Sequence, residues 1–189
     1  MRMFAATLLA ASALSTVALV GCTSGVASNA PVAGSSVRIE LPTGLGSGVY
    51  IGGLIITAAH VVSDAPRCNS AGECSPDRLP TVKLISDLGD VQDGEVLWLN
   101  KAYDIAAVRP ANAKRFTAAH LACRDTIVGE SLMAEGNPVG IPFLTFRGSV
   151  SGKPQEFLPN WKSAYVIDVT ISSGMSCGPS YDDYGEVIG

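Results

Sequence analysis

Short apolar runs bounded by glycine and proline are the feature of this sequence that most restricts how the chain can fold. The 189 residues include 20 glycines and 11 prolines, and these residues mark nearly every boundary between runs, as they do in turns. After the first 21 residues, no segment of ten or more has apolar residues at the 3.6-residue spacing of an amphipathic helix. The runs have the length and β-branched content of strands: 37–41, 49–51, 54–57, 81–85, 95–99, 105–108, 131–135, 144–150, 164–169 and 186–188.

This pattern predicts an all-β protein whose strands fall into two groups. Residues 112–120 form the expected linker between the groups, and each group predicts one of two packed antiparallel barrels or sandwiches. A chain of this length fits one compact domain or two small ones that share an interface. The formal net charge of −4 gives no basis for nucleic-acid binding, which depends on basic surfaces.

The N-terminus is typical of an export signal. Arg2 precedes an uncharged apolar run from Met3 to Val20, as in the n- and h-regions of a secretion signal. The run ends in Leu19-Val20-Gly21-Cys22, which resembles the lipobox of bacterial lipoproteins. In that family the signal is cut before the cysteine, whose sulfur then receives a diacylglycerol.

The resemblance implies a signal peptide over residues 1–21 and a membrane lipid anchor at Cys22. Residues 22–35, which are small and polar, are expected to be a flexible tether, and residues 36–189 are the folded domain. The predicted location is therefore the bacterial cell envelope, with the domain facing the periplasm or the exterior. The alternative is an ordinary signal peptide cut elsewhere, which leaves Cys22 without a role.

Export favours disulfide formation among the remaining cysteines. Cys68 and Cys74 lie in one polar loop that contains glycine and proline, so we expect a small disulfide-closed loop there. Their spacing is not that of a CxxC pair and no histidine accompanies them, so we expect no zinc or other metal. The sequence leaves open whether Cys123 reaches Cys177.

A serine loop near the C-terminus has the features of a nucleophile site. Ser176 lies in Gly174-Met175-Ser176-Cys177-Gly178-Pro179, where small residues allow a sharp turn and leave backbone N–H groups pointing outward. Such amides can hold a developing negative charge beside an exposed hydroxyl. The alternative is an ordinary glycine- and proline-rich loop in which the serine caps a turn.

Catalysis by a serine needs a base and a carboxylate that orients the base. Of the two histidines, His60 follows the apolar run 55–59 and is the better candidate, whereas His120 closes the basic linker and is expected to be an exposed loop residue. Asp104 opens the apolar run 105–108, where an acid is costly to bury without a partner. The alternatives are a core histidine with satisfied hydrogen bonds and an ordinary turn aspartate.

The motifs around His60, Asp104 and Ser176, in this order along the chain, resemble the trypsin-like serine proteases, in particular the bacterial HtrA-type branch. The first half has Gly46-Ser47-Gly48-Val49-Tyr50-Ile51, Ile56-Thr57-Ala58-Ala59-His60-Val61-Val62 and Tyr103-Asp104-Ile105-Ala106; the second has Gly136-Asn137-Pro138-Val139-Gly140 and the serine loop. The resemblance covers about residues 36–189. It implies two six-stranded β-barrels with the active site in the cleft between them, the second barrel being truncated at its C-terminal end.

The resemblance also implies roles for individual residues. His60 is the general base, Asp104 its orienting partner and Ser176 the nucleophile, and the N–H groups of Gly174 and Ser176 form the oxyanion hole. Thr170 and Ile171 match positions that line the specificity pocket, and their lack of charge argues against a preference for lysine or arginine. The implied partner is a protein or peptide substrate, hydrolysed through an acyl-enzyme without a cofactor.

The sequence departs from the family pattern at Cys177, where the family has glycine. The spacing to Pro179 favours Ser176 over Cys177 as the nucleophile, but the extra side chain can tilt the loop if the backbone there is strained. The leading prediction is a membrane-anchored serine endopeptidase. The alternative is a non-catalytic lipoprotein that uses a protease-like scaffold for binding.

Overall fold

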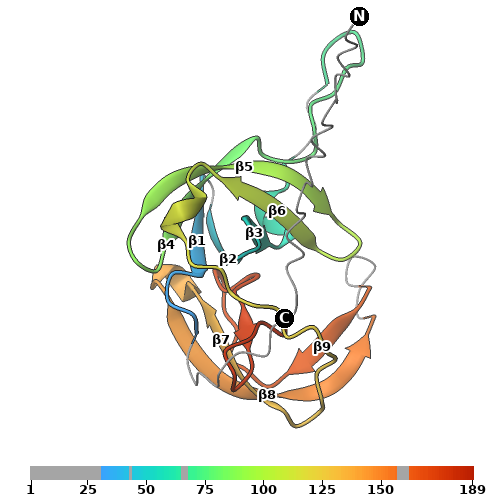
Figure 1. The fold of residues 1–189 in the computed structure, drawn as a ribbon. Helices are drawn as coiled ribbons and strands as arrows, with labels where there is room; N and C mark the ends of the chain where they lie inside the picture. The colour runs from blue at the N-terminus through green and yellow to red at the C-terminus, as the bar shows by residue number, and fades with distance from the viewer. Residues whose placement is uncertain (1–30, 43, 65–67, 157–161) are drawn as a thin grey trace, which may run out of the picture.

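The protein is described by a computed structural model that covers residues 31–42, 44–64, 68–156 and 162–189. Almost all of its regular structure is β-strand, and Figure 1 shows a barrel packed on a second, open sheet. The all-β prediction with two strand groups is therefore confirmed. The expected signal peptide, Cys22 and most of the expected tether lie outside the described residues.

The first half of the chain forms a closed antiparallel barrel. Its strand order is β1-β2-β3-β6-β5-β4, and alternating inward side chains of these strands form the largest core cluster, which includes Val37, Ile39, Leu84, Val96 and Val108. The strands are β1 (Ser36–Leu41), β2 (Gly44–Ile51), β3 (Leu54–Thr57), β4 (Thr81–Ser86), β5 (Val91–Asn100) and β6 (Ile105–Pro110).

The second half forms a four-stranded antiparallel sheet with the order β10-β7-β8-β9. Its strands are β7 (Ser131–Gly136), β8 (Leu144–Gln155), β9 (Ala164–Ile167) and β10 (Ser180–Tyr181). Leu132, Ala134, Val150 and Met175 form its core. Within the described ranges this sheet does not close on itself, so only the first of the two implied six-stranded barrels is complete.

Several strand boundaries differ from the sequence-based prediction: β5 begins at Val91 rather than at residue 95, and β8 continues to Gln155 rather than to residue 150. β2 begins at Gly44 rather than at Val49, because every residue of β1 finds a partner in β2, down to the pair Leu41 and Gly44 at the hairpin. The expected strand over residues 186–188 is reduced to isolated bridges of Val187 with Leu121 and Tyr181. Tyr181 itself belongs to β10, a strand that the sequence did not predict because it is only two residues long.

The two halves meet through a small mixed cluster. Tyr181 is fully buried and packs with Val49, Ala119 and Val187, while its hydroxyl lies 2.8 Å from Ser35 Oγ and 3.3 Å from Ser36 Oγ. The linker between the halves contains only the 3₁₀ turn η1 (Ala113–Arg115). The barrel and the sheet are therefore joined by packing and hydrogen bonds rather than by a shared strand.

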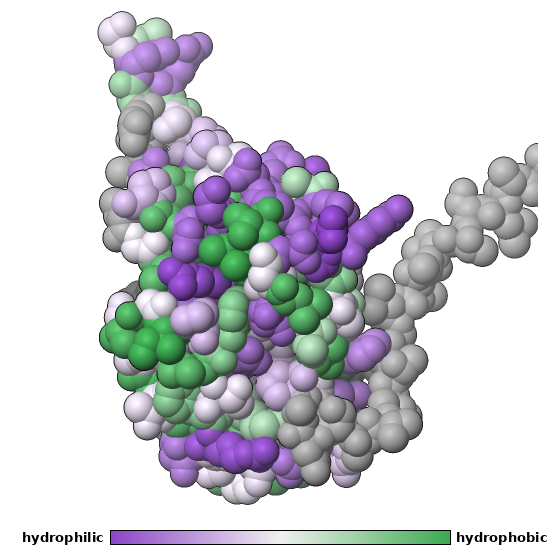
Figure 2. All heavy atoms as spheres, turned by 90° about the vertical axis from the view of Figure 1, so that its left-hand side faces the viewer, coloured by the Kyte–Doolittle hydropathy of each residue, from purple (hydrophilic) through white to green (hydrophobic). Residues whose placement is uncertain are grey.

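A loop closed by the predicted disulfide between Cys68 and Cys74 projects from the barrel. It is visible at the top of Figure 1, and Figure 2 shows mostly hydrophilic side chains on this projection. At its base, Asp77 pairs with Lys101, with 2.6 Å between the charged atoms. Across the ranges that the structure describes, no helix is long and apolar enough to cross a membrane.

Glu135 of β7 is a buried acid, only 6% exposed. Burial raises the pKa of its carboxyl to about 7; the Ser36 hydroxyl partly offsets this and the Asp87 charge adds to it. The folded protein therefore holds the proton more tightly than the unfolded chain, whose glutamate titrates near 4.5. The contribution to stability is complete below pH 4.5 and is lost as the pH rises through about 7.

We predict that Glu135→Gln reduces the pH dependence of stability, because the amide cannot ionise. Between pH 4.5 and 7 the free energy of unfolding of the wild type should fall by about 1–3 kcal/mol more than that of the variant. Urea denaturation at a series of pH values measures this difference. Glu95→Gln, which removes an exposed carboxylate from β5, is the control. Equal slopes for Glu135→Gln and the wild type would contradict the prediction.

Candidate active site

His60 and Asp104 form a hydrogen-bonded pair at one end of the barrel. His60 lies in the single helical turn α1 (Ala59–Val62), directly after β3, and Asp104 directly precedes β6. The imidazole Nδ1 is 2.7 Å from Asp104 Oδ2, and the backbone N–H of His60 donates to Oδ1 at 2.9 Å. Because both carboxylate oxygens are engaged, the carboxylate and the ring are held in one relative orientation.

This pair has the geometry of an oriented base. The carboxylate accepts a hydrogen bond from Nδ1–H, so the neutral imidazole presents Nε2 as a proton acceptor. The Asp104 side chain is 12% exposed, whereas that of His60 is 52% exposed, so the free edge of the ring is open to a ligand. Asp104 has φ = 51°, a left-handed conformation that aspartate tolerates better than most residues.

Ser176 lies opposite this pair, on a double turn that follows β9. The N–H of Met175 donates to Ser172 O at 3.1 Å, and that of Gly178 donates to Met175 O at 2.8 Å, which leaves Ser176 at the tip. Ser176 and His60 together line two neighbouring cavities. No hydrogen bond joins their side chains within the described residues, and such bonds often tighten only when substrate binds.

The backbone of the serine loop leaves both expected oxyanion donors available. Over the described part of the chain, the N–H groups of Gly174 and Ser176 donate to no protein acceptor. Gly174 has φ = 96°, and a Cβ at this position would lie 2.3 Å from the carbonyl oxygen of Asn137. A Cβ on Gly178 would lie 1.8 Å from Glu135 O. Only glycine fits at either position, which is the physical reason for the glycines that flank the serine.

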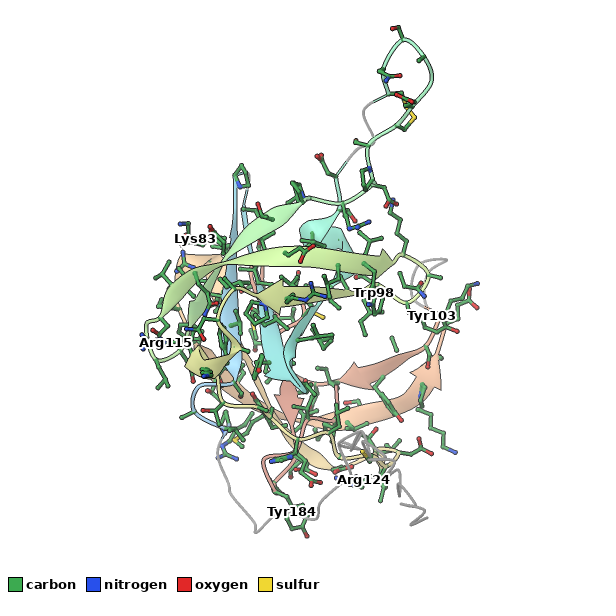
Figure 3. All side chains as sticks on the ribbon, turned by 45° about the horizontal axis from the view of Figure 1, so that its top comes forward. Lys83, Trp98, Tyr103, Arg115, Arg124 and Tyr184 are labelled. Atoms are coloured by element: carbon green, nitrogen blue, oxygen red, sulfur yellow. A yellow bond between two sulfur atoms is a disulfide. The ribbon has the colours of Figure 1, made fainter. Side chains whose placement is uncertain are left out.

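Two cavities share Ser176 and His60 in their linings. One has a volume of about 430 Å³ and is lined by Leu45, Leu79 and Ser173 besides His60, Gly174 and Ser176. The other, of about 360 Å³, is lined mainly by apolar side chains, among them Tyr103, Ile167 and Ile171. Figure 3 shows Tyr103 and Trp98 on the same side of the barrel.

Of the two residues expected in the specificity pocket, Thr170 and Ile171, only Ile171 lines a cavity next to Ser176. Ile171 lines the second cavity and is 59% exposed. Thr170 is exposed and is not among the residues that line this cavity. His120 is exposed, as expected for a loop residue. No group of three or more His, Cys, Asp or Glu side chains among the described residues could hold a metal ion.

Cys177 has a free thiol, so no disulfide joins it to Cys123. The residue reaches the surface, but the protein atoms around its sulfur and the nearby Asp104 charge raise the pKa of the thiol to about 12. A thiol with such a pKa is almost fully protonated at neutral pH and is a weak nucleophile. This favours Ser176 over Cys177 as the reactive group.

The comparisons with known proteins agree with this geometry. A model of the trypsin-like peptidase domain matches residues 46–189, so the chain belongs to this family. A probable periplasmic serine endoprotease DegP-like of Pseudomonas savastanoi pv. phaseolicola is 30% identical over 169 residues, which are 86% of this chain and 32% of that protein. The magnetosome formation protease MamE of Magnetospirillum gryphiswaldense is 30% identical over 152 residues, 77% of this chain and 18% of that protein.

Solved structures of similar proteins have the same fold. The crystal structure of Deg5 has a TM-score of 0.63 and 30% identity, and covers 84% of this chain and 78% of that one. The serine endoprotease from Yersinia pestis has a TM-score of 0.67 at 22% identity, covering 83% of this chain and 53% of that one. The chain spans about a third or less of the curated relatives it matches.

Three residues near the site were not assigned roles from the sequence. Ser47 and Asn137 lie within the motifs that resemble the family, but their side-chain contacts could not be inferred from spacing. Both are 1% exposed and contact each other behind the serine loop. Glu135 lines the second cavity. The only feature of the sequence that could have indicated this is an acid directly after the apolar run Leu132-Met133-Ala134.

The conformation of Cys177 predicts that glycine would be more stable there. Cys177 has φ = 58°, and left-handed conformations cost non-glycine residues about 1–2 kcal/mol. Because glycine also loses more entropy on folding, we expect Cys177→Gly to raise the free energy of unfolding by about 0.5–1 kcal/mol.

Urea denaturation of Cys177→Gly and Cys177→Ala tests this prediction. Alanine removes the thiol but keeps the Cβ, so it should give no comparable gain. Equal stabilities of the two variants would show that strain at this position is not the cause.

Proposed function

We propose that this chain is a serine endopeptidase that uses Ser176, His60 and Asp104 as a catalytic triad. The proposal rests mainly on the Asp104–His60 pair, whose free imidazole edge lies beside Ser176. The N–H groups of Gly174 and Ser176, which donate to no acceptor in the described structure, lie in the same loop. Membership of the trypsin-like peptidase family supports it. So do relatives that carry the name serine endoprotease.

The reaction follows from this arrangement. Ser176 Oγ attacks the carbonyl carbon of a peptide bond while His60 Nε2 takes the hydroxyl proton. The electron pair of the C=O bond moves to its oxygen, which accepts hydrogen bonds from the N–H groups of Gly174 and Ser176. His60 then gives its proton to the leaving amine, and an acyl group remains on Ser176. Water removes the acyl group, again with His60 as base.

Asp104 keeps His60 in the required tautomer and stabilises the imidazolium that forms. The second cavity has Ile167 and Ile171 in its wall, which favours apolar side chains of the substrate next to the cleaved bond. Asp104 and Glu135 also line this cavity, but Asp104 is bound to His60 and burial raises the pKa of Glu135 to about 7.

The triad predicts distinct effects for its members. Ser176→Ala should abolish labelling by a fluorophosphonate probe, because the probe reacts with the activated hydroxyl. Asp104→Asn should lower kcat for a peptide substrate by about 10⁴-fold with little change in KM, because the amide does not hold the right tautomer. Cys177→Ala is the control and should label as the wild type does. Labelling that survives both Ser176→Ala and His60→Ala would exclude this site.

A second candidate function is binding without catalysis. It is favoured by the left-handed Cys177 in the serine loop and by the lack of a described hydrogen bond between Ser176 and His60. A wild-type protein that binds peptides but neither cleaves them nor reacts with the fluorophosphonate would support this alternative.

We also propose that the chain is exported and held on a membrane of the cell envelope through a lipid at Cys22, with residues 1–21 as its signal peptide. Relatives of the domain are named periplasmic, which agrees with export. Stable anchoring by acyl chains requires more than one chain, as a lipidated N-terminal cysteine provides.

The lipid anchor predicts that Cys22→Ser moves the protein from the membrane fraction to the soluble fraction of cells. Cys177→Ser changes a free cysteine of the folded domain and should leave the distribution unchanged. Immunoblots of the two fractions measure the outcome. Full retention of Cys22→Ser in the membrane fraction would argue against the anchor.

A further inference from the structure

Ser47 makes an unusual set of contacts with the serine loop. It lies in β2, on the barrel, and is 1% exposed. Its N–H donates to Ser176 O at 3.0 Å, and its Oγ donates to Gly174 O at 2.8 Å. One residue of the barrel therefore holds two carbonyl groups of a loop that belongs to the other half of the chain.

Asn137 completes the hydrogen bonding of the Ser47 hydroxyl. Its Nδ2 donates to Ser47 Oγ at 2.8 Å and its backbone N–H at 3.2 Å. Ser47 Oγ thus donates once and accepts twice, which is the full capacity of a hydroxyl. The Oδ1 of Asn137 accepts from Phe143 N at 3.1 Å, which fixes the turn between β7 and β8.

The turn between β7 and β8 also holds the carbonyl group of Ser173, the residue directly before the serine loop. The N–H of Val139 donates to Ser173 O at 2.8 Å. Val139 is 74% exposed and has φ = 47°, a costly conformation for a β-branched residue. The strain is retained at a position whose N–H points at the serine loop.

These contacts affect the direction of the N–H groups of Gly174 and Ser176, the expected oxyanion donors. In a trans peptide the N–H points opposite to the C=O of the preceding residue, in the same plane. Holding Ser173 O on one side therefore directs the N–H of Gly174 to the other side. The N–H of Ser176 shares a peptide unit with Met175 O, which accepts from Gly178 N at 2.8 Å. Ser47 holds the two peptide units that flank this one, through Gly174 O and Ser176 O, and so restricts its rotation.

We propose that Ser47 and Asn137 are positioning residues that keep the N–H groups of Gly174 and Ser176 directed at the oxyanion of the reaction. Among the described residues they form no hydrogen bond with His60 or Asp104, and they act through the backbone of the serine loop. This inference rests on the proposed peptidase function and adds to it the side chains that prepare the oxyanion hole.

Kinetics separate this role from a purely structural one. Ser47→Ala should lower kcat for a peptide substrate by about 10²-fold, the usual effect of losing one oxyanion donor, and change KM by less than about threefold. Its affinity for a peptide aldehyde, which mimics the tetrahedral intermediate, should fall by a similar factor. Asn137→Ala is the second variant and should act in the same direction.

Ser86→Ala is the matched control, because Ser86 is also a buried serine of the barrel, in β4, but its hydroxyl accepts from the N–H of Asp90, away from the serine loop. It should keep kcat and the aldehyde affinity within about threefold of the wild type. A folded Ser47→Ala with wild-type kcat, or the same loss of kcat in Ser86→Ala, would overturn the proposal.

The amide NMR resonances of Gly174 and Ser176 test the positioning without catalysis. In the free protein both should shift in Ser47→Ala and stay in place in Ser86→Ala. Unchanged resonances in Ser47→Ala would overturn the positioning role. If the wild type fails to cleave peptides or react with the fluorophosphonate, the peptidase function fails, and the NMR comparison still decides whether Ser47 orients these amides.

Discussion

The hydrogen bonds from Ser47 to the serine loop are the contact on which the arrangement of the site depends. His60 and Asp104 belong to the barrel, whereas Ser176 belongs to the second half of the chain. The relative position of the two halves therefore decides whether these residues can act together. Ser47, 1% exposed, and Tyr181, fully buried, provide polar contacts between the halves. Buried hydrogen bonds of this kind define one arrangement because breaking them leaves unpaired polar groups.

The backbone around the site is held in conformations that the chain would otherwise avoid. Asp104, Val139, Phe143 and Cys177 all have φ between 47° and 58°. Each such residue costs about 1–3 kcal/mol, and such residues persist only where the surrounding contacts fix them. Here the contacts are the carboxylate bonds to His60 and the bonds that Asn137 and Val139 make to neighbouring loops. The strain lies in the loops, while the barrel core has regular alternating packing.

The sequence predicted the strands and the triad candidates better than the contacts between them. β3 has the predicted bounds because its apolar run is bounded by glycine and by the alanines before His60. The two-residue β10 could not be predicted, since it depends on pairing with β7. The role of Ser47 was also out of reach, because a serine between two glycines has no local signal for a partner 127 residues away. Thr170 was placed from the resemblance alone and does not line the cavity that Ile171 lines.

The most direct test of the account is a burst experiment with an active ester that releases a chromophore when it acylates the enzyme. A serine peptidase built on Ser176 and His60 should release about one equivalent of chromophore per chain in the first phase, before slower turnover. Mass spectrometry of the quenched protein should then find the acyl group on Ser176. A protein that shows no burst, or that has its acyl group on Cys177 or another residue, would contradict the account.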